Sequence, residues 1–109
     1  MAAKHRAVLA EIGEERLRQI RAEGWTLEHD DTHRRGQMAR AAAVYALVGS
    51  SDGRIPGDAD TPSITERLWP WEWSWFKPKA RRRNLIRAAA LLVAEIERLD
   101  RASPREEGG

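Results

Sequence analysis

Residues 85–99, Leu-Ile-Arg-Ala-Ala-Ala-Leu-Leu-Val-Ala-Glu-Ile-Glu-Arg-Leu, carry the clearest fold signal of this chain. Apolar side chains recur at alternating spacings of four and three residues, at Leu85, Ala89, Leu92, Ile96 and Leu99. This spacing is typical of an apolar seam of the coiled-coil type, which Ile86 and Val93 widen. We therefore expect a helix from about Pro78, a residue suited to a first helical turn, to about Arg101.

Two further helices are expected upstream of this segment. The helical spacing of Leu9, Ile12, Arg16 and Ile20 predicts a first helix from about Ala3 to Glu23, ended by Gly24. A second helix is expected to start near Asp31 or Thr32, either of which can cap it, and to run to about Val48. It is rich in alanine, which favours close approach of a neighbouring helix, and Met38 and Tyr45 are interpreted as core residues.

The connection to the last helix is long. Residues 49–66 are rich in Gly, Pro, Asp and Ser and are expected to form a loop, with a short extra helix around Ile64 to Leu68 as an option. The predicted fold class is all-α: a small antiparallel bundle of three main helices, with a long Trp-rich connection before the last one. The first and third helices are expected to pack side by side. One domain is expected over residues 1–102 and a polar tail over 103–109, and the widened seam suggests a homo-oligomer.

Composition narrows the class of protein. The chain has 109 residues, a formal net charge of +2 and no cysteine, so disulfides and thiolate metal sites are excluded. No apolar run approaches the roughly 20 residues that span a bilayer, and the N-terminus lacks the apolar stretch of a signal peptide. We therefore expect a cytoplasmic protein with no membrane partner.

The segment from Leu68 to Arg83 holds four of the five tryptophans and then a run of cations. Indole faces beside guanidinium groups suit a flat, negatively charged ligand, because bases stack on rings and phosphates pair with arginines. The residues that we assign to such a site are Trp71, Trp73, Trp75, Lys79, Arg81, Arg82 and Arg83. In an extended segment the alternating tryptophans would instead point to one side and cap the core.

Acidic residues gather at two places. Glu28, His29, Asp30, Asp31 and His33 form a patch that either holds a divalent metal or caps a helix N-terminus. Glu11 and Glu14 lie three apart on one face of the first helix. Together the two segments resemble the ExxE…ExxD pattern of the MazG-like all-α nucleotide pyrophosphohydrolases. The resemblance covers residues 11–31 and implies Glu11, Glu14, Glu28 and Asp31 as ligands of Mg²⁺ over a nucleoside triphosphate.

A second resemblance touches most of the chain. Residues 15–19, Gly24-Trp25, His29-Asp30-Asp31 and the Trp-Pro-Trp block are similar in style to small helical proteins of bacteriophages and prophages. Such proteins include sponges that sequester nucleotide immune signals, often as symmetric oligomers, and the resemblance implies an anti-defence role in a bacterial host cell.

Three functions follow as hypotheses. The first, which we favour, is non-catalytic binding of a phosphorylated small ligand, either a nucleotide or a cyclic or nucleotide-derived signal, with no catalytic residue and no cofactor. The second is a pyrophosphohydrolase that depends on Mg²⁺. The third is a nucleic-acid-binding protein, which is less favoured because a net charge of +2 is low for that class.

Overall fold

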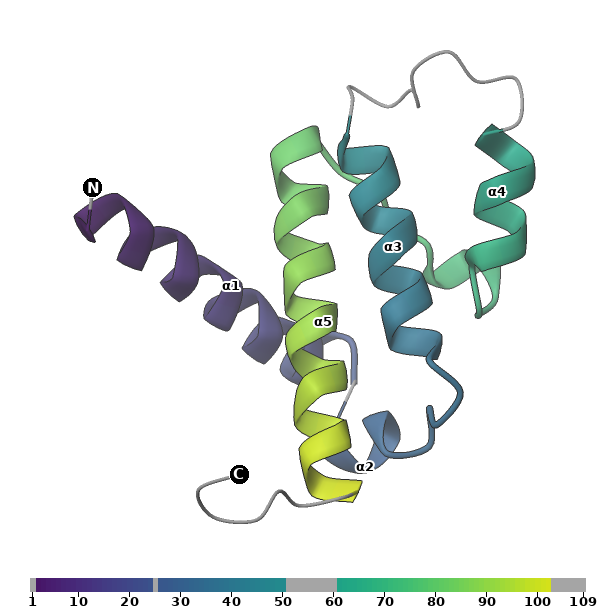
Figure 1. Ribbon diagram of the computed structural model, residues 1–109, viewed down its shortest axis with the longest axis horizontal. Coiled ribbons are helices and arrows are strands. Elements are labelled where there is room, and N and C mark those ends of the chain that lie inside the picture. The colour runs from purple at the N-terminus through teal and green to yellow at the C-terminus, as the bar shows by residue number, and fades with distance from the viewer. Residues whose placement is uncertain (1, 25, 51–60, 103–109) are drawn as a thin grey trace.

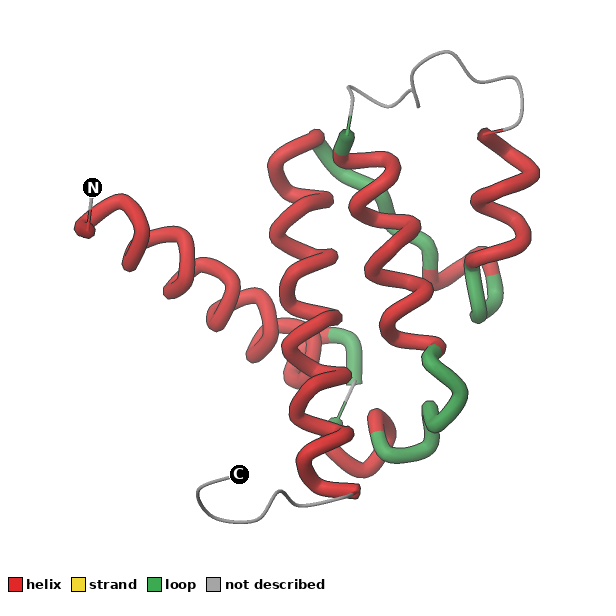
Figure 2. Tube along the Cα trace, viewed as in Figure 1, coloured by secondary structure: helices red, strands yellow, loops and turns green. Residues whose placement is uncertain are grey.

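The computed structural model describes residues 2–24, 26–50 and 61–102, and these are helical with short connections (Figures 1 and 2). The helices are α1 (Ala2–Ala22), α2 (Leu27–Asp30), α3 (Gln37–Gly49), α4 (Thr61–Leu68) and α5 (Arg81–Ala102), with a 3-10 turn, η1, at Trp73–Trp75. The described residues contain no strand, so the prediction of a small all-α bundle is confirmed. The predicted polar tail, residues 103–109, lies outside the described residues.

The centre of the fold is the pair α3 and α5, which lie side by side (Figure 1). Their contact surface is built largely from alanine: Ala41 and Ala42 of α3 and Ala88, Ala90 and Ala94 of α5 are all buried. Small side chains let two helix backbones approach closely, as the alanine-rich sequence predicts. The expected pairing of the first and last helices is only partly right, because α1 crosses α5 at an angle and its N-terminal half projects away from the bundle.

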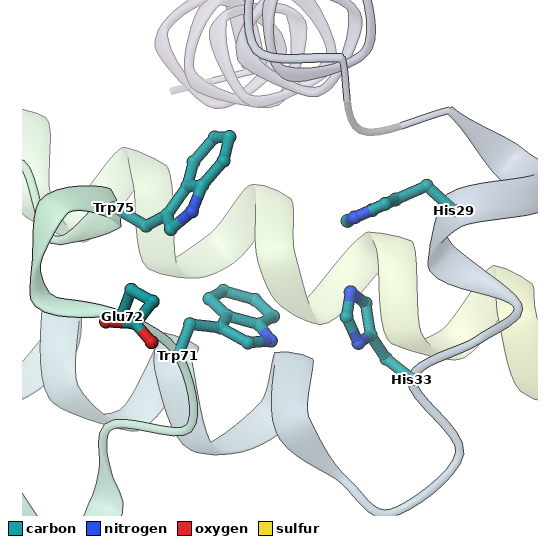
Figure 3. A pocket seen from close by; sticks show the side chains of 5 residues that line it. All are labelled: His29, His33, Trp71, Glu72 and Trp75. Carbon is teal, nitrogen blue, oxygen red and sulfur yellow. The ribbon is translucent and has the colours of Figure 1, made fainter.

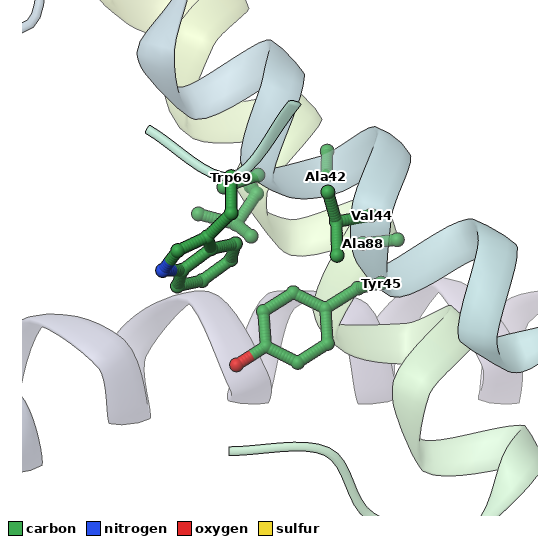
Figure 4. Close-up of a cluster of buried hydrophobic side chains, with 7 residues drawn as sticks. Ala42, Val44, Tyr45, Trp69 and Ala88 are labelled. Carbon is green, nitrogen blue, oxygen red and sulfur yellow. The ribbon is translucent and has the colours of Figure 1, made fainter. Parts of the chain in front are cut away.

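Aromatic side chains close the core beside α3. Trp69 is 6% exposed and packs edge-on against Tyr45, with 5.8 Å between ring centroids, and against Phe76 at 5.0 Å (Figure 4). The Tyr45 hydroxyl accepts a hydrogen bond of 2.9 Å from the Lys77 amide, so this buried polar group is satisfied. The prediction that Met38 and Tyr45 are core residues is confirmed, since both are 1% exposed.

The contact between α1 and α5 is polar instead of apolar. Arg16, which is 5% exposed, donates to Asp30 of α2 at 2.9 Å and to Glu97 of α5 at 3.1 Å. Glu15 is buried as well and accepts hydrogen bonds from Arg18 and Arg83. A buried charge is tolerated only with such partners, so the geometry of these pairs fixes how α1 lies across α5.

The predicted second helix is wrong at its start. Residues 31–36 form turns, and α3 begins only after Gly36, whose φ of +78° is a backbone state that side-chain-bearing residues rarely adopt. The cap instead belongs to the short helix α2, where the Thr26 hydroxyl accepts from the His29 amide at 3.1 Å. Gly24, with a φ of +71°, follows α1 as predicted.

Two other boundaries differ from expectation. The structure extends the optional short helix to Thr61–Leu68, which shortens the predicted loop, of which residues 51–60 lie outside the description. The last helix begins at Arg81 instead of Pro78, because the Asn84 side chain bonds both the amide and the carbonyl of Lys79 and holds that residue outside the helix. Among the described residues, no helix combines the length and apolarity needed to cross a bilayer.

The apolar seam of α5 faces solvent, although the spacing alone favours a buried face. Leu85, Leu92, Ile96 and Leu99 are 44%, 47%, 58% and 50% exposed. The side of α5 that meets α3 and α1 carries Ile86, Ala88 and Leu91 instead, together with buried polar residues. Helix α5 therefore has apolar side chains on two sides, and among the described residues most of the contacts are made with one of them.

The aromatic end of the core generates a stability prediction. Trp69→Ala should lower the free energy of unfolding by about 3–5 kcal/mol, the usual cost of truncating a buried large aromatic residue. Trp73→Ala is the matched control: this ring is 49% exposed and stacks on Trp69, so its loss should cost no more than about 1 kcal/mol. Urea denaturation followed by circular dichroism measures both, and equal losses would contradict the packing described above.

Candidate functional site

The segment after α4 is folded back on itself. Residues 73–75 form the turn η1, with hydrogen bonds of 3.0 Å from the Trp75 amide to the Glu72 carbonyl and from the Phe76 amide to the Trp73 carbonyl. The alternative of an extended segment with all tryptophans on one side is therefore wrong. The turn separates the rings: Trp69 enters the core, Trp71 is partly buried, and Trp73 and Trp75 are 49% and 42% exposed.

A second segment, at the end of α2, presents two imidazoles to this turn. The His33 amide donates to the Asp30 carbonyl at 3.0 Å, and the Thr32 hydroxyl donates to the His29 carbonyl at 2.7 Å, so the chain turns tightly after α2. This turn brings the rings of His29 and His33 edge to face, with 4.7 Å between their centroids.

The two segments enclose what we call the aromatic hollow, lined by His29, His33, Trp71, Glu72 and Trp75. Its volume is about 190 Å³, and the indoles face the imidazoles across it (Figure 3). Trp71 and His33 touch at one end, with 5.1 Å between their centroids, while the Lys77 ammonium lies 5.8 Å from the Trp75 ring. Lys77 therefore places a cation beside one wall.

Burial lowers the pKa of His33, and the charges of His29 and Arg98 lower it further. The negative charge of Glu95 acts in the opposite direction but does not cancel the shift. His33 is consequently neutral near pH 7. A neutral imidazole next to two indoles makes the hollow suited to an uncharged, flat ring.

A smaller hollow of about 140 Å³ lies between the turn that follows α2 and the end of α5. We call it the arginine hollow, lined by Asp31, Arg34, Arg98, Arg101 and Ala102. Arg101 donates to the Asp31 carboxylate at 2.7 Å, and Arg34 donates to the Asp31 carbonyl at 3.3 Å. Three guanidinium groups thus lie around one lining carboxylate, and Arg98 also pairs with Glu95 at 2.6 Å. The positive charge that remains suits an anion.

The cations expected beside the tryptophans lie elsewhere. Arg82 makes a bidentate pair with Glu11, both bonds 2.7 Å long, and Arg83 pairs with Glu15. Arg81 donates to the Gly49 carbonyl at 3.1 Å. The three arginines therefore join α5 to α1 and α3, and neither they nor Lys79 line the aromatic hollow. Of the assigned site residues, the structure brings together Trp71 and Trp75.

The four carboxylates implied by the MazG-like resemblance are also dispersed. Glu11 is bound to Arg82, whose hydrogen bonds lower the pKa of that carboxyl, and Asp31 is bound to Arg101. Glu14 and Glu28 are exposed to solvent. Within the described part of the chain, no three acidic or histidine side chains converge in a way that could hold a metal ion.

Two sets of residues escaped the sequence assignment. His29 and His33 were interpreted as metal ligands or as part of a helix cap, and their role as walls of a hollow depends on a turn 40 residues away in sequence. Arg34, Arg98 and Arg101 were not singled out. Their signal was weak, because Arg98 and Arg101 look like ordinary surface residues of a charged helix.

The lowered pKa of His33 predicts a pH dependence of stability. The unfolded chain takes up a proton at this residue near pH 6.5, whereas the folded chain takes it up only at lower pH. His33 therefore makes the free energy of unfolding fall as the pH drops from about 7 through this window. His33→Gln should flatten that part of the profile, measured by urea denaturation at a series of pH values, while His5→Gln on the exposed start of α1 should leave it unchanged.

Comparison with known proteins yields no identification for this chain. No protein-family model matches it, and neither a curated protein nor a solved structure matches it. Its function is therefore inferred from the geometry of the two hollows.

Proposed function

We propose that the protein binds a phosphorylated small molecule with a flat aromatic ring, of the nucleotide class, without altering it. The observation that carries the proposal is the aromatic hollow, in which Trp71 and Trp75 face His29 and His33. Two indoles and two imidazoles offer faces and edges to a ring, and stacking of a base on such side chains contributes about 1–3 kcal/mol per base.

The volume of the aromatic hollow limits the size of the ligand group that it can hold. Sites for drug-sized ligands measure roughly 300–1,000 Å³, and this hollow of about 190 Å³ is smaller. It suits a single ring system, so the sugar and phosphate of a nucleotide would extend outward along the protein surface. The rest of the binding site therefore has to be sought beside the hollow.

The cations next to the aromatic hollow supply phosphate-binding groups. Lys77 lies over Trp75, and the arginine hollow begins at Asp31, between the two histidines in sequence. Arg98 is close enough for its charge to act on His33. We assign the phosphate to these cations instead of Arg81–Arg83, because they lie beside the aromatic hollow, whereas Arg81–Arg83 bind Glu11, Glu15 and the end of α3. Arg101 and Arg98 also have carboxylate partners, Asp31 and Glu95, and a bound phosphate would share these cations with them.

Sequestration is the role that we propose for this binding. The phage-type resemblance of the sequence favours a sponge for a nucleotide-derived immune signal, acting as a homo-oligomer in the bacterial cytoplasm. Engagement of Glu11 by Arg82 and of Asp31 by Arg101 supports binding without turnover, since these carboxylates already have cationic partners. Hydrolysis with Mg²⁺ and binding of nucleic acid are alternative outcomes of the experiment below.

The first test is ligand binding by thermal shift and tryptophan fluorescence, with mono-, di-, tri- and cyclic nucleotides, each with and without Mg²⁺. A ligand at 100 times its dissociation constant stabilises the fold by about 2.7 kcal/mol, which raises the melting temperature by about 10 °C or more in a domain of this size. Trp75→Ala should weaken binding about 10- to 100-fold through lost stacking, and Trp73→Ala, outside the hollow, should not.

The outcomes of this experiment separate the three functions. Recovery of the ligand unchanged after denaturation supports sequestration, whereas release of pyrophosphate with Mg²⁺ would replace it with the hydrolase. Binding only to oligonucleotides, with an affinity that falls steeply with salt, would indicate a nucleic-acid-binding protein. If no nucleotide shifts the melting temperature, the proposal is abandoned.

The phosphate assignment generates its own prediction. Arg34→Ala and Arg101→Ala should each weaken the binding of a nucleoside triphosphate about 10-fold. Neither substitution should change the affinity for the corresponding nucleoside, because the nucleoside lacks the phosphate charge that these residues contact. Arg82→Ala is the matched control, an arginine whose side chain is 66% exposed and paired with Glu11, and it should change neither affinity. Isothermal titration measures all four combinations; loss of triphosphate affinity in Arg82→Ala alone would return the site to the start of α5.

A further inference from the structure

The solvent-facing side of α5 carries a continuous apolar stripe, which we call the outer seam: Leu85, Ala89, Leu92, Ile96 and Leu99. Its four large side chains are 44–58% exposed. The stripe spans 15 residues, or about 22 Å of helix at 1.5 Å per residue. Exposed apolar surfaces of this extent on one helix mark interaction sites more often than isolated exposed leucines do.

Within the described part of the fold, Leu85 lies against Gly49 at the end of α3, and Leu92, Ile96 and Leu99 remain about half exposed. Helix α3 packs on the side of α5 that carries Ala88 and Leu91, and α1 meets it through the partners of Arg16, Glu11 and Glu15. By helical geometry the outer seam lies opposite the buried alanines of α5, because residues two apart are about 160° apart about the helix axis: Leu92 is two residues from both Ala90 and Ala94, and Ile96 is two residues from Ala94. A solvated face would be polar, whereas this one repeats large apolar residues in register.

We propose that the outer seam is the interface of a homodimer in which two α5 helices pack antiparallel about a two-fold axis. Alternating spacings of four and three require a partner helix with the same spacing, so that side chains of one fit between those of the other. The α5 of a second copy supplies that spacing. A two-fold axis uses the same patch on both chains, so one seam is sufficient.

The charges along α5 select the antiparallel orientation. The exposed cations Arg81 and Arg82 lie at the start of the helix, and the exposed acids Glu97 and Asp100 lie near its end. Within one chain Arg82 pairs with Glu11 and Glu97 with Arg16, and the side chains of Arg82 and Glu97 remain 66% and 48% exposed. A parallel pair would bring the cations of both copies together. In an antiparallel pair the start of one helix lies beside the end of the other, and opposite charges meet.

The sizes of the side chains set the register. If Leu85 packs against Ile96 of the second copy, then the small Ala89 lies opposite Leu92, and Arg81 lies opposite Asp100. Leu99 then lies opposite Arg82 of the second copy, at the edge of the apolar layers. The interface shares no residue with the aromatic or arginine hollow, so it does not depend on the proposed ligand.

The oligomeric state of the full chain tests the proposal. Size-exclusion chromatography with light scattering should give twice the 12.4 kDa of one chain at micromolar concentration. Ile96→Glu should weaken the dimer at least 100-fold and give the mass of one chain with unchanged helical circular dichroism, since Ile96 is 58% exposed within one copy. Leu27→Glu is the matched control, because Leu27 is 44% exposed on α2, away from the seam, and this variant should remain dimeric.

Introduced cysteines test the orientation, since the chain has none of its own. The double variant Leu85→Cys with Ile96→Cys should form a covalent dimer on mild oxidation, and neither single variant should. Cross-linking by a single variant would show a parallel pair and overturn the antiparallel arrangement. A wild-type chain with the mass of a monomer at all concentrations, or a dimeric Ile96→Glu variant, would overturn the interface.

Discussion

The guanidinium of Arg16 is the interaction on which the arrangement of the molecule depends. It lies 5% exposed between Asp30 of α2 and Glu97 of α5, and it reaches both with hydrogen bonds of about 3 Å. Burial raises the pKa of Asp30 and the charge of Arg16 opposes that shift, so the carboxylate depends on this partner. Because His29 directly precedes Asp30 and His33 follows three residues later, the ion pair that ties α2 to the bundle also positions the imidazole wall of the aromatic hollow.

Buried charges also explain the division of α5 into unlike sides. Toward α3 the helix offers alanines, which permit close approach, while toward α1 it meets the glutamates and arginines of that helix. Burial by itself raises the pKa of Glu15, but the hydrogen bond from Arg18 and the charges of Arg83 and Arg87 outweigh it and hold that pKa low. Polar contacts take the place of the apolar contacts that would ordinarily join two long helices at this interface, and Leu85, Leu92, Ile96 and Leu99 of α5 remain on the outside. The proposed dimer interface is thus a consequence of how the polar contacts are arranged.

The packing of Trp69 and the turn η1 together position the indoles of the proposed ligand site. Trp69 occupies the core position beside Tyr45 and Phe76, and Trp71 packs edge-on against it. The 3-10 turn after Glu72 then aims Trp75 toward His29, while Trp71 packs on His33. The arginines after the turn bind α1 and the end of α3, so the cations beside the hollow are Lys77 and those of the arginine hollow.

The sequence by itself determined the helical class, the approximate bounds of α1 and α5, the break at Gly24, the close approach of the alanine-rich helix and the burial of Met38 and Tyr45. These features depend on local spacing and on residue type, which are legible along the chain. Only the tertiary structure decided which side of α5 is covered, where each indole points and which acid holds each arginine. Arg82 and Glu11 are 71 residues apart, and the seam pattern is the same whether its partner is in the same chain or in another. Such choices follow from competition between contacts across the whole fold, and no single segment of sequence contains them.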